Sequence, residues 1–126
     1  MSDLSQALGL SASGMAAQAQ RLRHISENIS NQDTPGYRRK LIAFDQDSQT
    51  GYVSASAVKL DRTALERIYD PSHPLADAEG YYNGSNVDLV IEIADAREAQ
   101  RSYEANLKLF DQARQMTQSI FDLLRK

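Results

Sequence analysis

The chain has 126 residues, of which 41% are hydrophobic, 25% charged and 7% aromatic, and its formal net charge is −3. This length suits one domain or two small ones. The cations are spread over both halves, which argues against a dedicated nucleic-acid-binding protein. Cysteine is absent, so disulfides, thiolate metal sites and cysteine nucleophiles are excluded. The first ten residues do not resemble a secretory signal, and no segment approaches transmembrane length.

The N-terminal segment predicts a long amphipathic helix. Its apolar residues recur at spacings of three and four, as they do along the seam of a coiled coil. These residues are Leu4, Leu8, Ala12, Met15, Ala19, Leu22, Ile25 and Ile29. Alanine and serine fill many positions of this stripe, so the helix alone buries little apolar area. We therefore expect it to need partners to stay folded.

The stretch after this helix predicts a joint that ends the helix and redirects the chain. Asn31 can adopt the left-handed conformation that terminates helices. Thr34 precedes a proline and is therefore disfavoured in the helical region. Pro35 and Gly36 suit the second and third positions of a type II turn. From Tyr37 onward the chain is expected to be extended.

The middle of the chain predicts short strands and loops with no independent core. Weak alternation of apolar and polar residues marks extended segments near residues 37–44 and 51–60. Residues 70–84 are interrupted by Pro, Asp and Gly, which is typical of turns.

The C-terminal segment predicts a second and longer helix. Ser85, with Asp88 three residues later, has a weak capping-box pattern, and neither Pro nor Gly occurs from Ser85 to the end. Apolar or small residues follow at helical spacing: Leu89, Ile93, Ala96, Tyr103, Leu107, Phe110, Ala113, Thr117, Ile120 and Leu124. About 40 residues at 1.5 Å rise would form a rod about 60 Å long.

These patterns together predict a mainly α protein. Two long terminal helices are expected to pack as an antiparallel, coiled-coil-like pair, with a short irregular and β-containing segment between them. The predicted segments are a helix at 1–30, a joint at 31–40, a β and loop segment at 41–84, and a helix at 85–126. Two helices cannot enclose both of their own apolar stripes, which favours partner-dependent folding over a bundle closed within one chain.

Blocks of this sequence resemble the bacterial flagellar basal-body rod protein family. SENISNQDTPGYRR at 26–39 is similar to the N-terminal signature of rod and hook proteins, and ALGLSASGMAAQAQRLRHISENI at 7–29 extends that similarity. IYDPSHPLADAEGYY at 68–82 and REAQRSYEANLKLFDQARQM at 97–116 follow in the family's order and favour its proximal-rod members. NGSNVDL at 83–89 has the character of a second proximal-rod branch, and Gln32 stands where smaller residues are usual.

The resemblance implies a structural subunit of the proximal rod. Such a subunit would assemble through its terminal helices into an axial helical tube that transmits torque and conducts export. Its implied partners are other rod subunits, copies of itself and the flagellar export apparatus. Its implied location is the basal body, spanning the periplasm after type III export from the cytoplasm without a cleaved signal. The alternative is a soluble helical-hairpin binding module or an export adaptor.

Two sets of residues are predicted to carry the function. The joint set is Asn28, Asn31, Thr34, Pro35, Gly36, Tyr37 and Arg38. The assembly seam, an apolar stripe expected to pack inside the assembly, is Leu8, Met15, Leu22, Ile29, Tyr103, Leu107, Phe110, Ile120 and Leu124.

Phosphate binding, metal binding and catalysis are weaker interpretations of the sequence. The cations at 38–40 could grip phosphates, but a solvated turn, or cations that meet acids of a neighbouring subunit, fits an acidic chain better. The possible ligands Asp70, His73, Asp77 and Glu79 match no standard metal spacing, and such residues more often bond local backbone.

His24 is expected to be a packed or surface residue of the first helix. No nucleophile elbow and no Gly-rich phosphate loop accompanies it. The sequence therefore predicts no catalytic residue, metal, cofactor, small-molecule substrate or nucleic-acid partner.

Overall fold

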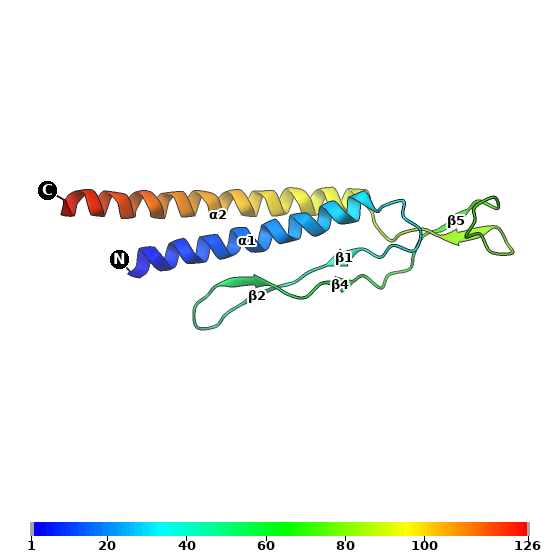
Figure 1. The fold of residues 1–126 in the computed structure, drawn as a ribbon, viewed down its shortest axis with the longest axis horizontal. Helices are drawn as coiled ribbons and strands as arrows, with labels where there is room; N and C mark the ends of the chain where they lie inside the picture. Colours follow the sequence, from blue (N-terminus) through cyan, green and yellow to red (C-terminus); the bar gives the residue numbers. More distant parts are fainter. Residues whose placement is uncertain (1, 126) are drawn as a thin grey trace.

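The computed structural model describes residues 2–125, and it is elongated (Figure 1). The elements are α1 (Ser2–Ser30), β1 (Lys40–Leu41), β2 (Phe44–Gln46), β3 (Val53–Ala55), β4 (Lys59–Leu60), β5 (Arg67–Tyr69), β6 (Tyr81–Asn83) and α2 (Leu89–Leu124). The two helices run antiparallel, and their outer ends lie at the same end of the molecule (Figure 1). The predicted fold class is confirmed, although the predicted helix ends at 1 and 126 lie outside the described residues.

The second helix begins later than predicted. Its N-cap is Asp88, whose carboxylate accepts a hydrogen bond of 3.0 Å from the Val90 backbone N–H. Ser85 is not the cap, because its hydroxyl donates to the carbonyl oxygen of Gln32 in the joint. A tertiary contact thus replaces the predicted capping box. From Leu89 the helix continues for 36 residues, a length of about 54 Å.

The helices pack on each other mainly through small and polar side chains. The buried residues of α1 are Ser11, Gly14, Ala17, Ile25 and Asn28, and those of α2 are Glu92, Ala99 and Ala113. Gly14 lies against Asn106, since a Cβ added to it would come within 2.8 Å of the Asn106 amide nitrogen. Small side chains at such a contact allow two helix axes to approach closely.

This packing leaves much of the apolar surface of α2 uncovered. The exposed large residues of α2 are Leu89, Val90, Ile91, Ile93, Leu107, Leu109, Met116, Phe121, Leu123 and Leu124. The pair therefore does not enclose its own apolar residues, as the sequence had indicated. Within residues 2–125, neither helix contains a stretch apolar and long enough to cross a bilayer.

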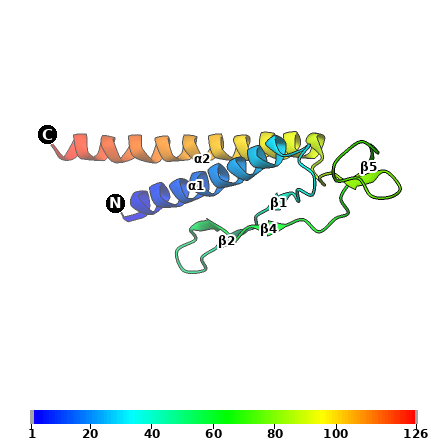
Figure 2. The same ribbon diagram turned by 45° about the vertical axis from the view of Figure 1, so that its right-hand side comes forward.

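The middle of the chain forms a narrow antiparallel ribbon, as predicted for short strands without a core. β1 pairs with β4, with Lys40 opposite Leu60, and β2 pairs with β3, with Phe44 opposite Ala55. The register shifts by one residue between the two pairs, which is the signature of a bulge. Figure 2 shows the ribbon still beside α1 after the view is turned.

The ribbon is fastened to α1 near its middle. The backbone N–H of Val53 donates to the hydroxyl of Ser13 over 3.1 Å, and that hydroxyl donates to the Leu10 carbonyl over 2.8 Å. Gly9 lies against the ring of Tyr52, and the two approach so closely that a side chain at position 9 would collide with it. The ribbon thus depends on α1 for its position.

The β5–β6 hairpin projects from the opposite end of the molecule (Figure 1). The rings of Tyr69 and Tyr81 meet edge to face at 5.1 Å, and the Arg67 guanidinium lies 4.8 Å from the centre of the Tyr81 ring. His73 stacks on Tyr82 at 3.9 Å. These aromatic contacts support a hairpin that no sheet or helix among residues 2–125 covers.

Candidate functional site

The joint contains the predicted type II turn. The Tyr37 backbone N–H donates to the Thr34 carbonyl over 3.1 Å, which closes the turn around Pro35 and Gly36. Gly36 has a φ of 76°, the left-handed value that the third position of this turn requires. The Gly36 N–H donates to the Gly84 carbonyl over 3.1 Å, so the turn also holds the chain just before α2.

Asn31 ends α1 in a different way from the predicted one. No residue other than glycine has a positive φ within residues 2–125, so the left-handed conformation predicted for Asn31 was wrong. Its backbone and side-chain N–H groups instead donate to the Glu27 carbonyl over 3.1 and 2.8 Å. Its side-chain oxygen accepts from the Thr34 hydroxyl over 3.1 Å. The amide thus satisfies the helix end without a strained backbone.

Asn28 connects α1, the joint and α2. The side chain is 1% exposed, and its oxygen accepts hydrogen bonds of 2.8 Å from the Tyr37 hydroxyl and from the Lys40 backbone N–H. Its nitrogen donates to the Lys40 carbonyl over 3.1 Å and to a Glu92 carboxylate oxygen over 3.3 Å. All four bonding positions of the amide are therefore used, which makes a buried polar group tolerable.

Arg39 supplies the cation that compensates Glu92. The Glu92 side chain is 0% exposed, and the Arg39 Nε–H donates to it. Arg39 also donates to Asp95 over 3.0 Å and lies 3.5 Å from a carboxylate oxygen of Asp61. Burial lowers the pKa of Arg39, but the hydrogen bond and charge of Glu92, with the charge of Asp95, outweigh it and raise the pKa overall. A buried carboxylate is acceptable only with such a partner.

The next cation, Lys40, pairs with an acid on the last turns of α1. Its ammonium group donates to the Glu27 carboxylate. This hydrogen bond lowers the pKa of Glu27 and raises that of Lys40. Burial raises the pKa of Tyr37 beside them. We call the set Asn28, Tyr37, Arg39, Lys40, Glu92 and Asp95 the polar hub.

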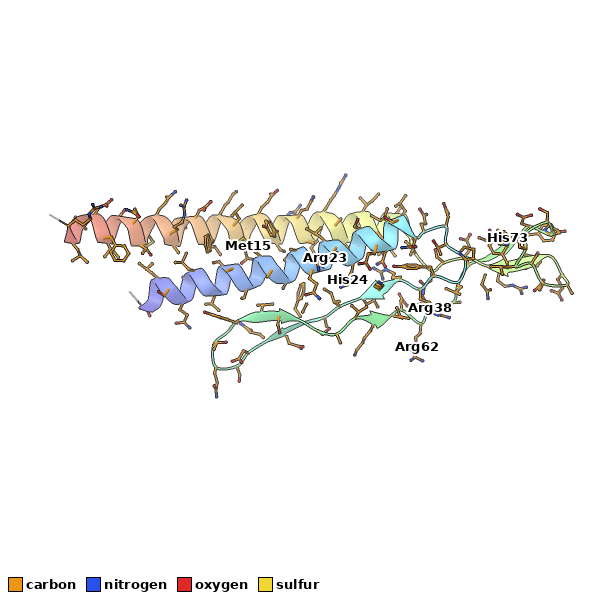
Figure 3. All side chains as sticks on the ribbon, in the orientation of Figure 1. Met15, Arg23, His24, Arg38, Arg62 and His73 are labelled. Carbon is orange, nitrogen blue, oxygen red and sulfur yellow. The ribbon has the colours of Figure 1, made fainter. Side chains whose placement is uncertain are left out.

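The structure shows what two of the cations at 38–40 contact within the chain. Arg39 and Lys40 pair with acids of their own chain, and a contact with a neighbouring subunit stays a prediction. Arg38 was the predicted member of this group, yet its guanidinium donates to the backbone carbonyls of Asp61 and Thr63 over 3.2 and 3.0 Å. Figure 3 shows Arg38 beside Arg62 at the base of the ribbon.

Sequence reasoning named Arg39 only among the cations at 38–40 and missed Glu92, Asp95 and Asp61. A signal for Glu92 was present, because Glu92, Ala99, Asn106 and Ala113 recur every seven residues. These four residues lie on the side of α2 that contacts α1. A charged residue in a heptad otherwise made of small side chains indicates a buried partner.

The possible metal ligands at the hairpin tip bond local backbone instead. Asp77 accepts from the Glu79 N–H over 2.9 Å, and the His73 ring accepts from the Leu75 N–H over 3.1 Å. His73 lies far from His24 on α1 (Figure 3). Within residues 2–125, no three such side chains come together as a metal site would need.

The predicted assembly seam is only partly covered within the chain. None of its residues is fully buried; Leu107 is 40% and Leu124 is 73% exposed. Seven are partly buried: Leu8, Met15, Leu22, Ile29, Tyr103, Phe110 and Ile120. The fully buried positions of α2 are instead the heptad residues Glu92, Ala99 and Ala113, and the seam stays a prediction about surfaces between subunits.

A long helical pair, fixed at one end by the polar hub and with large apolar residues exposed on α2, is suited to packing against further helices. Residues 8–38 match the family model for the flagella basal body rod protein, and residues 78–123 match that for the flagellar basal body rod FlgEFG protein C-terminal region.

Individual relatives agree with the two family models. The chain is 42% identical to the flagellar basal-body rod protein FlgC of Agrobacterium fabrum, over 99% of this chain and 98% of that protein. It is 33% identical to the protein of the same name from Aquifex aeolicus, over 97% and 98%. For the one from Salmonella typhimurium the identity is 33%, over 85% and 87%. The chain belongs to the flagellar basal-body rod protein family and is a structural rod subunit; the predicted resemblance is confirmed.

Proposed function

We propose that this rod subunit assembles through the outer faces of α1 and α2 into the axial tube of the rod. Its neighbours in that tube are other rod subunits and copies of itself. The observation that supports this is the set of large apolar residues that α2 exposes after α1 has packed on it. Burying such residues at about 25 cal/mol per Å² would drive association between subunits. The tube would transmit torque and conduct export.

The polar hub supports this assembly by fixing the shape of each subunit. It ties the end of α1, the joint and the start of α2 together through hydrogen bonds whose geometry is directional. The ribbon and the hairpin both leave from this region. Repeated contacts in a helical assembly require that every subunit present the same surfaces.

The proposed route to the rod is type III export from the cytoplasm, after which the subunit lies in the part of the basal body that crosses the periplasm. The buried apolar residues are Ala17, Ile25, Ala99 and Ala113. A chain with so little apolar core is unfolded at low cost, which suits passage through a narrow export channel. No catalytic role is proposed, since the relatives are structural rod proteins.

The test is Leu107→Asp in a strain whose own gene is deleted. Leu107 is 40% exposed on α2, so the change should leave synthesis and export intact and block incorporation into rods. Electron microscopy should show no rods, hooks or filaments, whereas the wild-type gene restores all three. Gln115→Asp, which adds the same charge at another exposed position of α2, is the matched control and should assemble. Normal rods built with the Leu107 variant would refute the assignment.

A further inference from the structure

We infer that the β5–β6 hairpin of one copy docks on a basic pocket at the base of the ribbon in a second copy. The inference rests on the proposed function and adds a contact between the middle segments to the proposed contacts of the helices. The pocket, which we call the arginine pocket, is shallow, measures about 530 Å³ and is lined by Arg38, Leu60 and Arg62. Figure 3 shows both arginines on the same side of the ribbon base.

Arg38 is held in a fixed position by its own chain. One guanidinium nitrogen, Nη1, donates to the backbone carbonyls of Asp61 and Thr63 over 3.2 and 3.0 Å. The other nitrogens of the group have no partner within residues 2–125 and are available to a carboxylate. A planar guanidinium can bind a carboxylate through two parallel hydrogen bonds, and a group already held in place loses little freedom when it does so.

The rest of the arginine pocket adds a second charge and an apolar surface. Arg62 is exposed and forms no ion pair within residues 2–125, and Leu60 is 54% exposed. The acid between them in the sequence, Asp61, faces the polar hub instead, where its carboxylate lies 3.5 Å from a guanidinium nitrogen of Arg39. The pocket therefore suits a partner that combines carboxylates with exposed apolar side chains.

The β5–β6 hairpin has this complementary character. Its residues 67–83 include three acids and one cation. The cation, Arg67, is already paired with Asp77 over 3.2 Å, whereas Glu79 is exposed and its carboxylate has no partner within residues 2–125. Tyr69 is 63% and Leu75 is 64% exposed. The hairpin thus offers negative charge and apolar surface where the arginine pocket offers positive charge and apolar surface.

The hairpin must come from another copy, since its base holds it away from the arginine pocket of its own chain. Glu66, directly before β5, accepts from the Gly84 N–H over 2.7 Å and donates to the Ser85 carbonyl over 3.2 Å. From there the hairpin projects away from the ribbon in both Figure 1 and Figure 2. Each copy offers one hairpin and one pocket, and a contact between unlike surfaces can repeat to build an open helical array.

Charge exchange tests the contact, with rods counted by electron microscopy in the strain whose own gene is deleted. Arg62→Glu and Glu79→Arg each bring like charges together, and each alone should reduce the number of rods per cell by about tenfold or more. Both changes in one chain restore opposite charges and should return the number of rods close to the wild-type value. Lys59→Glu makes the same change of charge at an exposed position of β4, on the face opposite Leu60. It is the matched control and should build rods normally.

Three results would overturn the inference: normal rods with either single variant, an equal loss of rods with Lys59→Glu, or no recovery in the double variant. The last result would mean that the arginine pocket meets a surface other than the hairpin of a second copy. Leu107→Asp separates these failures from failure of the proposed function. If both single variants build normal rods and Leu107→Asp does not, the docking is wrong and the proposed function stands. If Leu107→Asp builds normal rods as well, both are wrong.

Discussion

The two ends of the helical pair are built from different interactions. At the end near the joint, the buried polar groups of the hub form hydrogen bonds with one another, and Asn28 and Glu92 are almost completely buried. At the other end the fully buried residues have small side chains, and Phe121, Leu123 and Leu124 of α2 are exposed. The difference teaches that polar contacts fix the shape within this chain, while large apolar residues of α2 remain exposed and available for the proposed contacts between subunits.

The main effect of the hub is to fix the register of α2 against α1, and its net contribution to stability is small. Taking a carboxylate such as Glu92 out of water costs several kcal/mol, and its partners do little more than offset that cost. A single polar residue in a heptad is known to select one alignment of two helices. The bonds from Arg39 and Asn28 to Glu92 would be lost if α2 slid by one turn.

The largest expected effect at the hub comes from Glu92→Ala. It leaves Arg39 and Asn28 without their shared partner and should lower the free energy of unfolding by about 3 kcal/mol. Urea denaturation followed by circular dichroism measures this. Glu104→Ala, at an exposed position of the same helix, should change it by less than about 0.5 kcal/mol. If both variants lowered the free energy of unfolding equally, Glu92 would have no special structural role and the hub would not differ from the rest of the helical pair.

Gly36→Ala sharpens the role of the turn that leads into the hub. Gly36 has a φ of 76° and no atom within 4 Å of an added Cβ, so only the backbone is strained. The variant should lose about 1 kcal/mol of stability. Gly36→Asn should lose less, because asparagine tolerates the left-handed region. Denaturation curves of the two variants that coincide with the wild type would contradict the turn's role.

At the opposite end, Leu123→Asp should have almost no effect on the isolated chain. The side chain is 70% exposed, so the free energy of unfolding should stay within about 0.5 kcal/mol of the wild-type value. The measurement is the same denaturation at low protein concentration. A loss of more than about 1 kcal/mol would show that the C-terminal end of α2 is already packed within its own subunit.

Acid should weaken the hub side by less than the Glu92→Ala substitution does. The Thr63 backbone N–H, together with Arg39, holds the pKa of Asp61 below its reference value of 3.8. A group with a lowered pKa in the folded state stabilises it above the unfolded pKa, and that stability is lost as pH falls through the folded value. Asp61→Asn should therefore flatten the fall in stability below about pH 4. An unchanged acid slope in thermal unfolding would contradict this.

Local chemistry made much of the fold predictable. The residues Thr34 to Gly36 specify the turn in sequence, and apolar periodicity specifies both helices. The Ser85 cap failed because a local pattern cannot anticipate the hydrogen bond from Ser85 to Gln32. For Asn31 the side chain offered a second way to end the helix, equally compatible with the sequence.

The hub could not be predicted in the same way. Arg39 and Asn28 lie 53 and 64 positions from Glu92, and nothing local joins them. The contacting stripe on α1 was also missed, because Ser11, Gly14 and Ala17 carry little hydrophobicity. Apolar periodicity highlights the larger residues, most of which are only partly buried here.

Hydrogen–deuterium exchange along the two helices of the isolated chain tests the central claim most directly. The account predicts slow exchange beside the hub, at residues 24–30 and 92–99, and faster exchange at residues 3–10 and 113–124. Uniform protection along both helices, or slower exchange at residues 113–124 than beside the hub, would contradict it.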